Sequence, residues 1–215
     1  MKKIILIGDS IRMGYDKYVK DSLSAVAEVY YPDSNSNFSQ NVLRNAYEWK
    51  REGNWPTDAD LVHWNAGLWD VLEIFDDGPM TPIEFYRDNI RRIDKRLRLL
   101  FPDAKMVFAT STAVREEGYL GAYKRHNSII EKYNEAALSV LSETDTVIND
   151  LYEITKNIPE EYCSDMTHYN TPLGAKYMGG AVISKICDTL GIDKISDIDL
   201  DSFRPETYTK KEIGF

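Results

Sequence analysis

The chain has 215 residues, of which 43% are hydrophobic and 28% charged. This is the composition of one globular domain, or of one domain with an appendage, and it excludes a fibrous or disordered chain. The 26 basic and 35 acidic residues give a formal net charge of −9, so we expect neither nucleic acid nor an anionic membrane among the partners. No apolar run reaches the roughly 18–20 residues that are needed to cross a bilayer.

The predicted elements alternate between short β-branched runs and longer segments of helical period, the pattern of a parallel sheet covered by helices. Five strands with crossover helices predict a flavodoxin-like fold, a three-layer α/β/α sandwich around a parallel sheet. In chain order we expect strands over Lys3–Ile7, Ala25–Tyr30 and Asp60–Trp64, a helix over Pro82–Phe101, a strand over Ala104–Thr110, a helix over Tyr123–Leu141, a strand over Asp145–Ile148 and a helix from Thr171 to Gly191.

The last helix marks the end of the domain. Thr171 is a good N-cap residue, Pro172 favours the first position of a helix, and Gly191 is a typical helix-ending residue. We therefore place the domain at residues 1–191. Residues 192–215 are polar and weakly patterned, and they predict a C-terminal surface tail that packs back through Phe203 or Phe215.

The amino terminus and the cysteines predict a cytoplasmic protein. Lys2 and Lys3 precede an apolar run that ends after four residues, at Gly8. A signal peptide needs an apolar region of about 7–15 residues, so we interpret this run as the first strand. Cys163 and Cys187 lack metal-ligand spacing and predict neither a metal site nor a disulfide framework.

A candidate nucleophile follows the first strand, in the triplet Gly8-Asp9-Ser10. Ligands of such sheets bind outside the carboxyl ends of the strands. A serine at that point presents its hydroxyl beside a helix N-terminus, whose free N–H groups can stabilise an oxyanion. Taken alone, the triplet fits an ordinary strand-to-helix turn with a cap better, because all three residue types are common in turns.

A candidate base stands near the other end of the chain, where Asp165 and His168 precede the last helix. An Asp and a His three apart in a turn can fold so that the carboxylate binds one ring nitrogen and the other serves as a general base. A turn with a capping carboxylate is an equally good interpretation of this pair alone. The other two histidines, His63 and His126, are expected to be packed or surface residues.

Together, Ser10, Asp165 and His168 give the chain order Ser…Asp…His over a matching succession of strands and helices. This resembles the SGNH hydrolase family, also called GDSL-type esterases and lipases, whose first block reads Gly-Asp-Ser and whose last reads Asp-x-x-His. The resemblance extends from about Lys3 to Leu190. It implies a serine esterase in which His168 removes the Ser10 proton, Asp165 holds the imidazole, and no metal or organic cofactor is needed.

The two middle blocks depart from the pattern of the family. Its third block usually reads Gly-x-Asn-Asp, and the segment Gly67–Asp70 has Trp69 where the asparagine of the oxyanion hole belongs. Tryptophan has a single N–H donor and a large ring, so Asn65 is the better amide donor. The second block normally supplies a glycine N–H, for which Ser36 is the best positional match. The resemblance thus implies an oxyanion hole made of the Ser10 and Ser36 N–H groups with the Asn65 side chain.

The expected substrate is a small-molecule or carbohydrate ester. Trp69 and Asp9 are candidate substrate-binding residues, although Asp9 fits a role in fixing the nucleophile turn better. Trp64 and Trp69 could stack on a sugar ring, but tryptophans near strand ends more often belong to the core. For Arg115, a surface salt bridge is a better interpretation than contact with an anionic substrate.

The absence of a long apolar lid favours short acyl esters, such as O-acetyl groups on carbohydrate. The oligomeric state stays open. A competing hypothesis is a flavodoxin-like binding module in which Ser10 and His168 are relics, and the missing block asparagine keeps it open.

Overall fold

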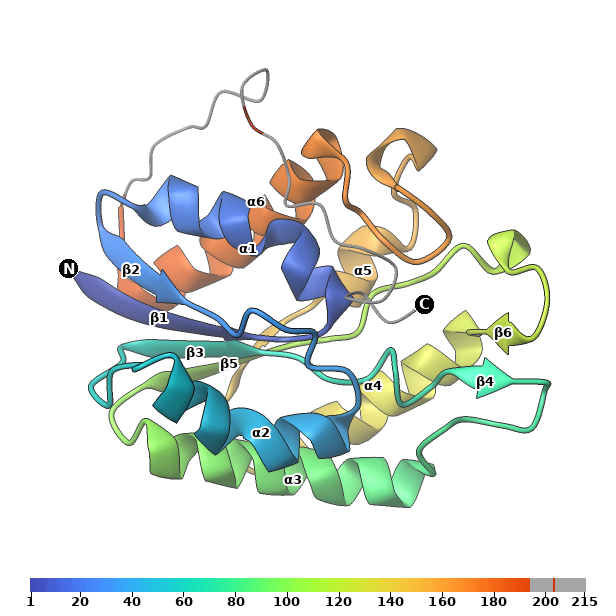
Figure 1. Cartoon of the computed structure of the whole chain (residues 1–215), viewed down its shortest axis with the longest axis horizontal. Coiled ribbons are helices and arrows are strands. Elements are labelled where there is room, and N and C mark those ends of the chain that lie inside the picture. Colours follow the sequence, from blue (N-terminus) through green and yellow to red (C-terminus); the bar gives the residue numbers. More distant parts are fainter. Residues whose placement is uncertain (194–202, 204–215) are drawn as a thin grey trace.

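A five-stranded parallel sheet organises the chain, with the strand order β2-β1-β3-β5-β7 in the computed structural model (Figure 1). The structure describes residues 1–193 and residue 203. All five predicted strands are present, and their ends differ from the prediction by one or two residues. They are β1 (Lys2–Ile7), β2 (Ala27–Tyr30), β3 (Leu61–Trp64), β5 (Lys105–Ala109) and β7 (Val147–Asn149).

Helices cover both faces of the sheet, which confirms the predicted three-layer sandwich (Figure 1). The helices α1 (Ser10–Leu23) and α6 (Pro172–Leu190) pack together on one face. The opposite face carries α2 (Ser39–Glu52), α3 (Ile83–Leu100) and α4 (Asn127–Leu141), and a short α5 (Leu151–Thr155) follows β7. No helix in the described part of the chain is both long and apolar enough to span a membrane.

The three predicted helices are present for the expected local reasons. In α3 the apolar stripe made by Tyr86, Ile90, Ile93 and Leu97 is buried, as the periodicity of the sequence requires. At the start of α6 the Thr171 hydroxyl caps the Gly174 N–H at 3.0 Å.

A pair of two-residue strands was not predicted. β4 (Glu73–Ile74) belongs to the loop that follows β3, β6 (Tyr123–Lys124) belongs to the loop that follows β5, and the two strands pair antiparallel. The helix expected over Tyr123–Leu141 therefore begins only at Asn127. Strands this short have no periodicity of their own, and each depends on a partner far away in the sequence.

The pairing register brings the carboxyl ends of the strands to one edge. Ile7 is paired with Trp64, Trp64 with Phe108, and Ala109 with Asn149. The loops that start after these residues therefore begin side by side. Because β1 lies between two neighbours and both its faces are covered, residues 4–7 are fully buried.

Phe203 packs against α1. Its ring is buried and packs edge-to-face on Tyr18, with ring centroids 5.4 Å apart. The remainder of the predicted surface tail, with Phe215, falls on residues 194–202 and 204–215, which lie outside the described residues.

Candidate active site

Ser10 is the first residue of α1, and two residues, Gly8 and Asp9, separate it from β1. Asp9 is the N-cap, and its Oδ1 accepts a hydrogen bond from the Ile11 N–H at 2.9 Å. This cap fixes the strand-to-helix turn. The Ser10 N–H is one of the first amides of the helix, for which the helix itself supplies no carbonyl acceptor. The Ser10 side chain therefore stands at the carboxyl edge of the sheet, next to the positive end of a helix.

Asp165 and His168 lie in one tight turn before α6. Asp165 Oδ1 accepts hydrogen bonds from the N–H groups of Thr167 at 2.7 Å and of His168 at 2.8 Å. Asp165 Oδ2 lies 2.8 Å from Nδ1 of the His168 ring. Oδ1 also lies 3.0 Å from Nδ1, so the carboxylate shapes the turn with one oxygen and orients the imidazole with both.

The charge of the Asp165 side chain favours this arrangement of carboxylate and imidazole. Burial raises the pKa of the Asp165 carboxyl, but its hydrogen bond to His168, the charge of that ring and the two backbone N–H donors outweigh burial and lower the pKa to about 2. Asp165 is therefore an anion at neutral pH. It holds Nδ1 of His168 as the protonated nitrogen and leaves Nε2 as the acceptor.

The structure brings the three residues into line. Nε2 of His168 lies 2.8 Å from Oγ of Ser10, across a sequence separation of 158 residues. Both side chains are nearly inaccessible to water, with Ser10 4% and His168 1% exposed. A hydroxyl, an imidazole and a carboxylate in this order can generate a nucleophilic oxygen.

Asp9 is 1% exposed, so little of its carboxylate is available to a substrate, and the cap fits its predicted role in the turn. Burial raises the pKa of Asp9, while the Ile11 N–H and the positive charge of Arg125 act against that rise. Its second oxygen, Oδ2, has no hydrogen-bond partner among the described residues.

The predicted oxyanion donors other than Ser10 are already engaged. The Ser36 N–H donates to the Gly8 carbonyl at 3.3 Å, and its single proton is thereby used inside the protein. One N–H of the Asn65 side chain donates to the Ala109 carbonyl at 2.7 Å. An amide nitrogen carries two protons, so Asn65 keeps a second N–H for another acceptor.

The segment that aligns with the family's third block holds Trp69 and Asp70. Trp69 is half-buried and packs edge-to-face on Phe38, with ring centroids 5.4 Å apart. Asp70 is fully buried and accepts hydrogen bonds from both the N–H and the hydroxyl of Ser39 at the start of α2. Burial raises the pKa of Asp70 to about 6, although the Ser39 bonds lower it. Asp70 therefore ties the loop after β3 to α2.

Arg125 is a buried residue near the site that sequence analysis did not single out. Its Nε donates to the Leu68 carbonyl at 2.6 Å, and its Nη1 lies 3.4 Å from the Tyr119 hydroxyl. That hydroxyl lies 2.7 Å from Oγ1 of Thr167, the neighbour of His168. A chain of polar contacts thus links the loop before Trp69 to the turn of the imidazole. No local pattern marks this arginine, because its partners are distant in sequence.

The remaining candidates lie where the sequence placed them. His63 is fully buried in β3, where its Nε2 lies 3.1 Å from the Asn149 amide and burial lowers the pKa of the ring to about 3. His126 precedes α4 and faces Glu116 at 3.1 Å. Trp64 belongs to the core, and Arg115 forms an ion pair with Glu160 at 2.8 Å.

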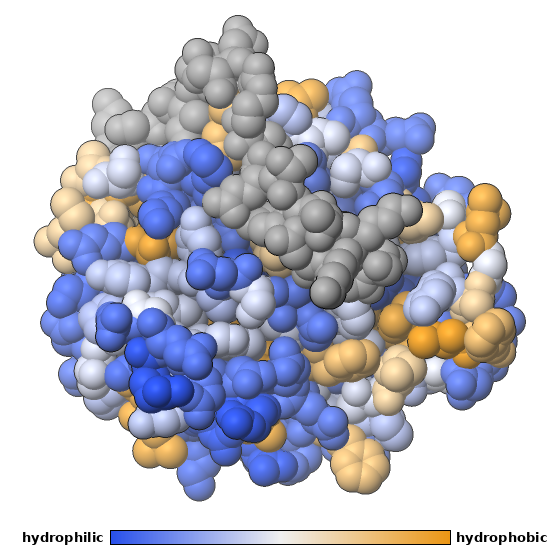
Figure 2. Space-filling model, viewed as in Figure 1, coloured by the Kyte–Doolittle hydropathy of each residue, from blue (hydrophilic) through white to orange (hydrophobic). Residues whose placement is uncertain are grey.

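Exposed apolar side chains gather over β4 and β6, at the right of the view in Figure 2. They include Phe75, Leu120 and Tyr123, each more than half exposed.

No group of three or more His, Cys, Asp or Glu side chains suited to a metal occurs among the residues that the structure describes.

Comparisons with known proteins agree with this fold. No protein-family model matches the sequence, and no curated protein matches it. Among solved structures, a lipase/acylhydrolase from Enterococcus faecalis is 17% identical with a TM-score of 0.67, covering 97% of this chain and 100% of its own. A GDSL-like lipase from Bacteroides thetaiotaomicron is 15% identical with a TM-score of 0.66, covering 89% of each chain. An acetyl xylan esterase is 16% identical with a TM-score of 0.64, covering 86% of this chain and 99% of its own. These structures share the fold of most of this chain.

Proposed function

We propose that this chain is an SGNH-type serine hydrolase that cleaves carboxylic esters through an acyl-enzyme. The observation that carries the proposal is the continuous line from Asp165 through His168 to Ser10, with 2.8 Å at each of its two contacts. The structures of similar fold described as acylhydrolases and esterases support it.

In the first half of the reaction, Nε2 of His168 takes the Ser10 proton as Oγ forms a bond to the ester carbonyl carbon. The carbonyl π electrons move to oxygen, and the Ser10 N–H with the second N–H of Asn65 binds that oxyanion. Ser36 is left out of this set because the Gly8 carbonyl already takes its proton. As the oxyanion collapses, the C–O bond breaks and His168 protonates the departing alcohol. Water then repeats the sequence on the acyl-Ser10 ester and releases the acid.

We propose short acyl esters, such as O-acetyl groups on carbohydrate, as the substrates. The similarity of fold to an acetyl xylan esterase supports this class. Trp69, half-buried in the loop after β3, offers an aromatic face for a sugar ring.

The test is hydrolysis of p-nitrophenyl acetate by the native chain and by Ser10→Ala. We expect the variant to lose at least about a thousandfold in kcat, because residues of such a triad act as a unit. Ser22→Ala is the matched control: Ser22 lies buried in the same helix, and its hydroxyl has no partner in the described part of the chain. Equal rates for the native chain and Ser10→Ala would favour the alternative, a binding module with this fold.

A further inference from the structure

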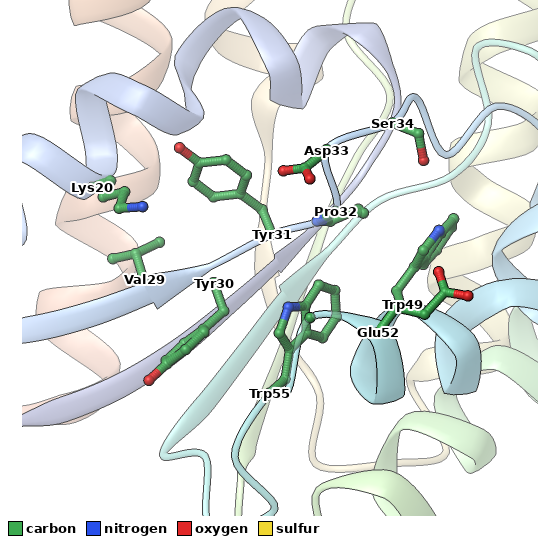
Figure 3. A pocket seen from close by; sticks show the side chains of 11 residues that line it. Lys20, Val29, Tyr30, Tyr31, Pro32, Asp33, Ser34, Trp49, Glu52 and Trp55 are labelled. Atoms are coloured by element: carbon green, nitrogen blue, oxygen red, sulfur yellow. The ribbon is translucent and has the colours of Figure 1, made fainter.

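A cavity of about 410 Å³ opens beside β2, the edge strand of the sheet (Figure 3). Its walls come from α1, from β2 and the loop after it, and from the end of α2. Neither Ser10 nor His168 is among its described lining residues, which include Tyr31, Pro32, Asp33, Trp49, Glu52 and Trp55. The cavity is thus separate from the candidate active site.

Aromatic rings form opposite walls of this cavity. Figure 3 shows Tyr31 on the side of α1 and Trp49 with Trp55 on the side of α2, with Pro32 between them. Trp55 is buried, and its indole lies so close to Gly53 that a Cβ on that residue would overlap the ring. The position of this indole is therefore fixed by packing before any ligand arrives, which reduces the entropy lost on binding.

The charged groups that line the cavity are two carboxylates and one ammonium. Asp33 and Glu52 outnumber Lys20, so an anion is disfavoured. The Tyr31 ring already has Lys20 Nζ 5.3 Å and Arg12 Cζ 5.5 Å from its centroid, and these two positive side chains disfavour a further cation beside it. These side chains favour a neutral ligand with apolar faces and many hydroxyl groups. Its faces would pack on the indole rings of Trp49 and Trp55, and its hydroxyls would donate to the carboxylates.

We propose that this cavity binds a neutral oligosaccharide. The proposal deepens the proposed function and rests on it for the link to ester cleavage: the cavity would hold a sugar chain whose acyl groups are cleaved at Ser10.

The loop after β2 connects the two places. The Ser34 carbonyl, on the cavity side, accepts a hydrogen bond from Nη2 of Arg12 at 2.8 Å. Two residues later, the Ser36 N–H binds the Gly8 carbonyl next to the nucleophile turn. Two residues span at most about 7 Å, so the Ser34 end of the cavity lies close to the nucleophile turn.

The test is calorimetric titration of the full chain carrying Ser10→Ala, which leaves any ester intact, with xylo-, cello- and manno-oligosaccharides. We expect Trp49→Ala in this background to bind at least about tenfold more weakly, because one aromatic wall is lost. Asp33→Asn, an exposed loop substitution with little effect on folding, should weaken binding severalfold. Phe85→Ala is the matched control, since this exposed ring lies on α3 outside the cavity.

Absence of binding by the whole panel, equal affinity in Trp49→Ala, or tighter binding of choline than of any sugar would overturn the proposal. Hydrolysis of p-nitrophenyl acetate by Phe85→Ala with Ser10 retained is the second readout, and it should equal the native rate. A chain that binds sugars through Trp49 but cleaves no ester would refute the proposed function and leave the cavity as a saccharide site.

Discussion

The two oxygens of the Asp165 carboxylate share its two tasks unequally. Oδ1 accepts the backbone N–H groups of the turn and lies 3.0 Å from Nδ1 of His168, and Oδ2 lies nearer that nitrogen, at 2.8 Å. Asparagine keeps an oxygen for the turn and replaces Oδ2, the nearer acceptor of the ring proton, by an N–H donor. It would therefore favour the opposite tautomer of the imidazole, in which Nε2 carries the proton and cannot accept one from Ser10.

We therefore expect Asp165→Asn to lower kcat by about 10³–10⁴-fold while its midpoint of urea unfolding at pH 7 changes little. Steady-state rates and denaturation curves on the two proteins check this. A variant that retains most of its activity would remove Asp165 from the mechanism.

Asp70 makes stability depend on pH. Burial raises its folded-state pKa to about 6 from 3.8, so the folded chain binds a proton that the unfolded chain has already released. A carboxyl whose pKa is raised in the folded state stabilises the fold below about pH 4, and this stabilisation is lost as the pH rises through 6. Relative to Asp70→Asn, the native free energy of unfolding should fall by about 2 kcal/mol between pH 4 and pH 7. Urea titrations at each pH measure the difference, and parallel curves for the two proteins would contradict it.

At the scale of the elements, the contact between α1 and α6 decides whether the site forms. Ser10 begins α1, and His168 lies four residues before α6. The two helices can approach closely because Gly179 of α6 faces the Tyr18 ring of α1, and a Cβ on Gly179 would lie 2.6 Å from that ring. A Cβ on its neighbour Gly180 would have no such atom within 4 Å.

Substitution of these adjacent glycines should have opposite effects. Gly180→Ala should stabilise the fold by about 0.5–1 kcal/mol, since alanine favours a helix interior. Gly179→Ala should destabilise it and also lower kcat, because Tyr18 and α1 must move and Ser10 moves with them. Thermal unfolding and esterase rates provide the readout. Similar melting temperatures for the two variants would mean that the helices are not in close contact at Gly179.

At the scale of the whole molecule, the formal charge of −9 should discriminate between substrates. An anionic ester, such as an acetylated uronic acid oligosaccharide, is repelled on approach, whereas an acetylated neutral xylo-oligosaccharide is not. Raising the salt from about 0.01 M to about 0.15 M shortens the screening length from about 30 Å to about 8 Å. We expect kcat/KM to rise with salt for the anionic ester only. Equal salt responses of the two esters would show that the surface charge does not act at the site.

The features that the sequence could predict are those that residues close together in the sequence determine. The sheet and the long helices carry their own periodicity, and Gly8-Asp9-Ser10 and Asp165…His168 are short motifs at strand and helix ends. The contacts that support the site are not local. Arg125 binds the Leu68 carbonyl across 57 residues, and no spacing rule anticipates this.

The donors of Ser36 and Asn65 are a second example of contacts that the sequence could not predict. The sequence assigns each donor to the oxyanion hole from its place after a strand, but in the structure each binds a carbonyl at a neighbouring strand end. Such competition between acceptors depends on the register of the sheet, which only the folded structure defines.

The long separation between the hydroxyl and the imidazole also has a kinetic consequence. No single stretch of chain contains both groups, so they meet only after β1 has been inserted between its neighbours and the last helix has docked. Contacts of this range are the slow ones in folding, because the chain must first close a large loop. During renaturation, turnover of a chromogenic ester would therefore return with the last structural signal and never ahead of it.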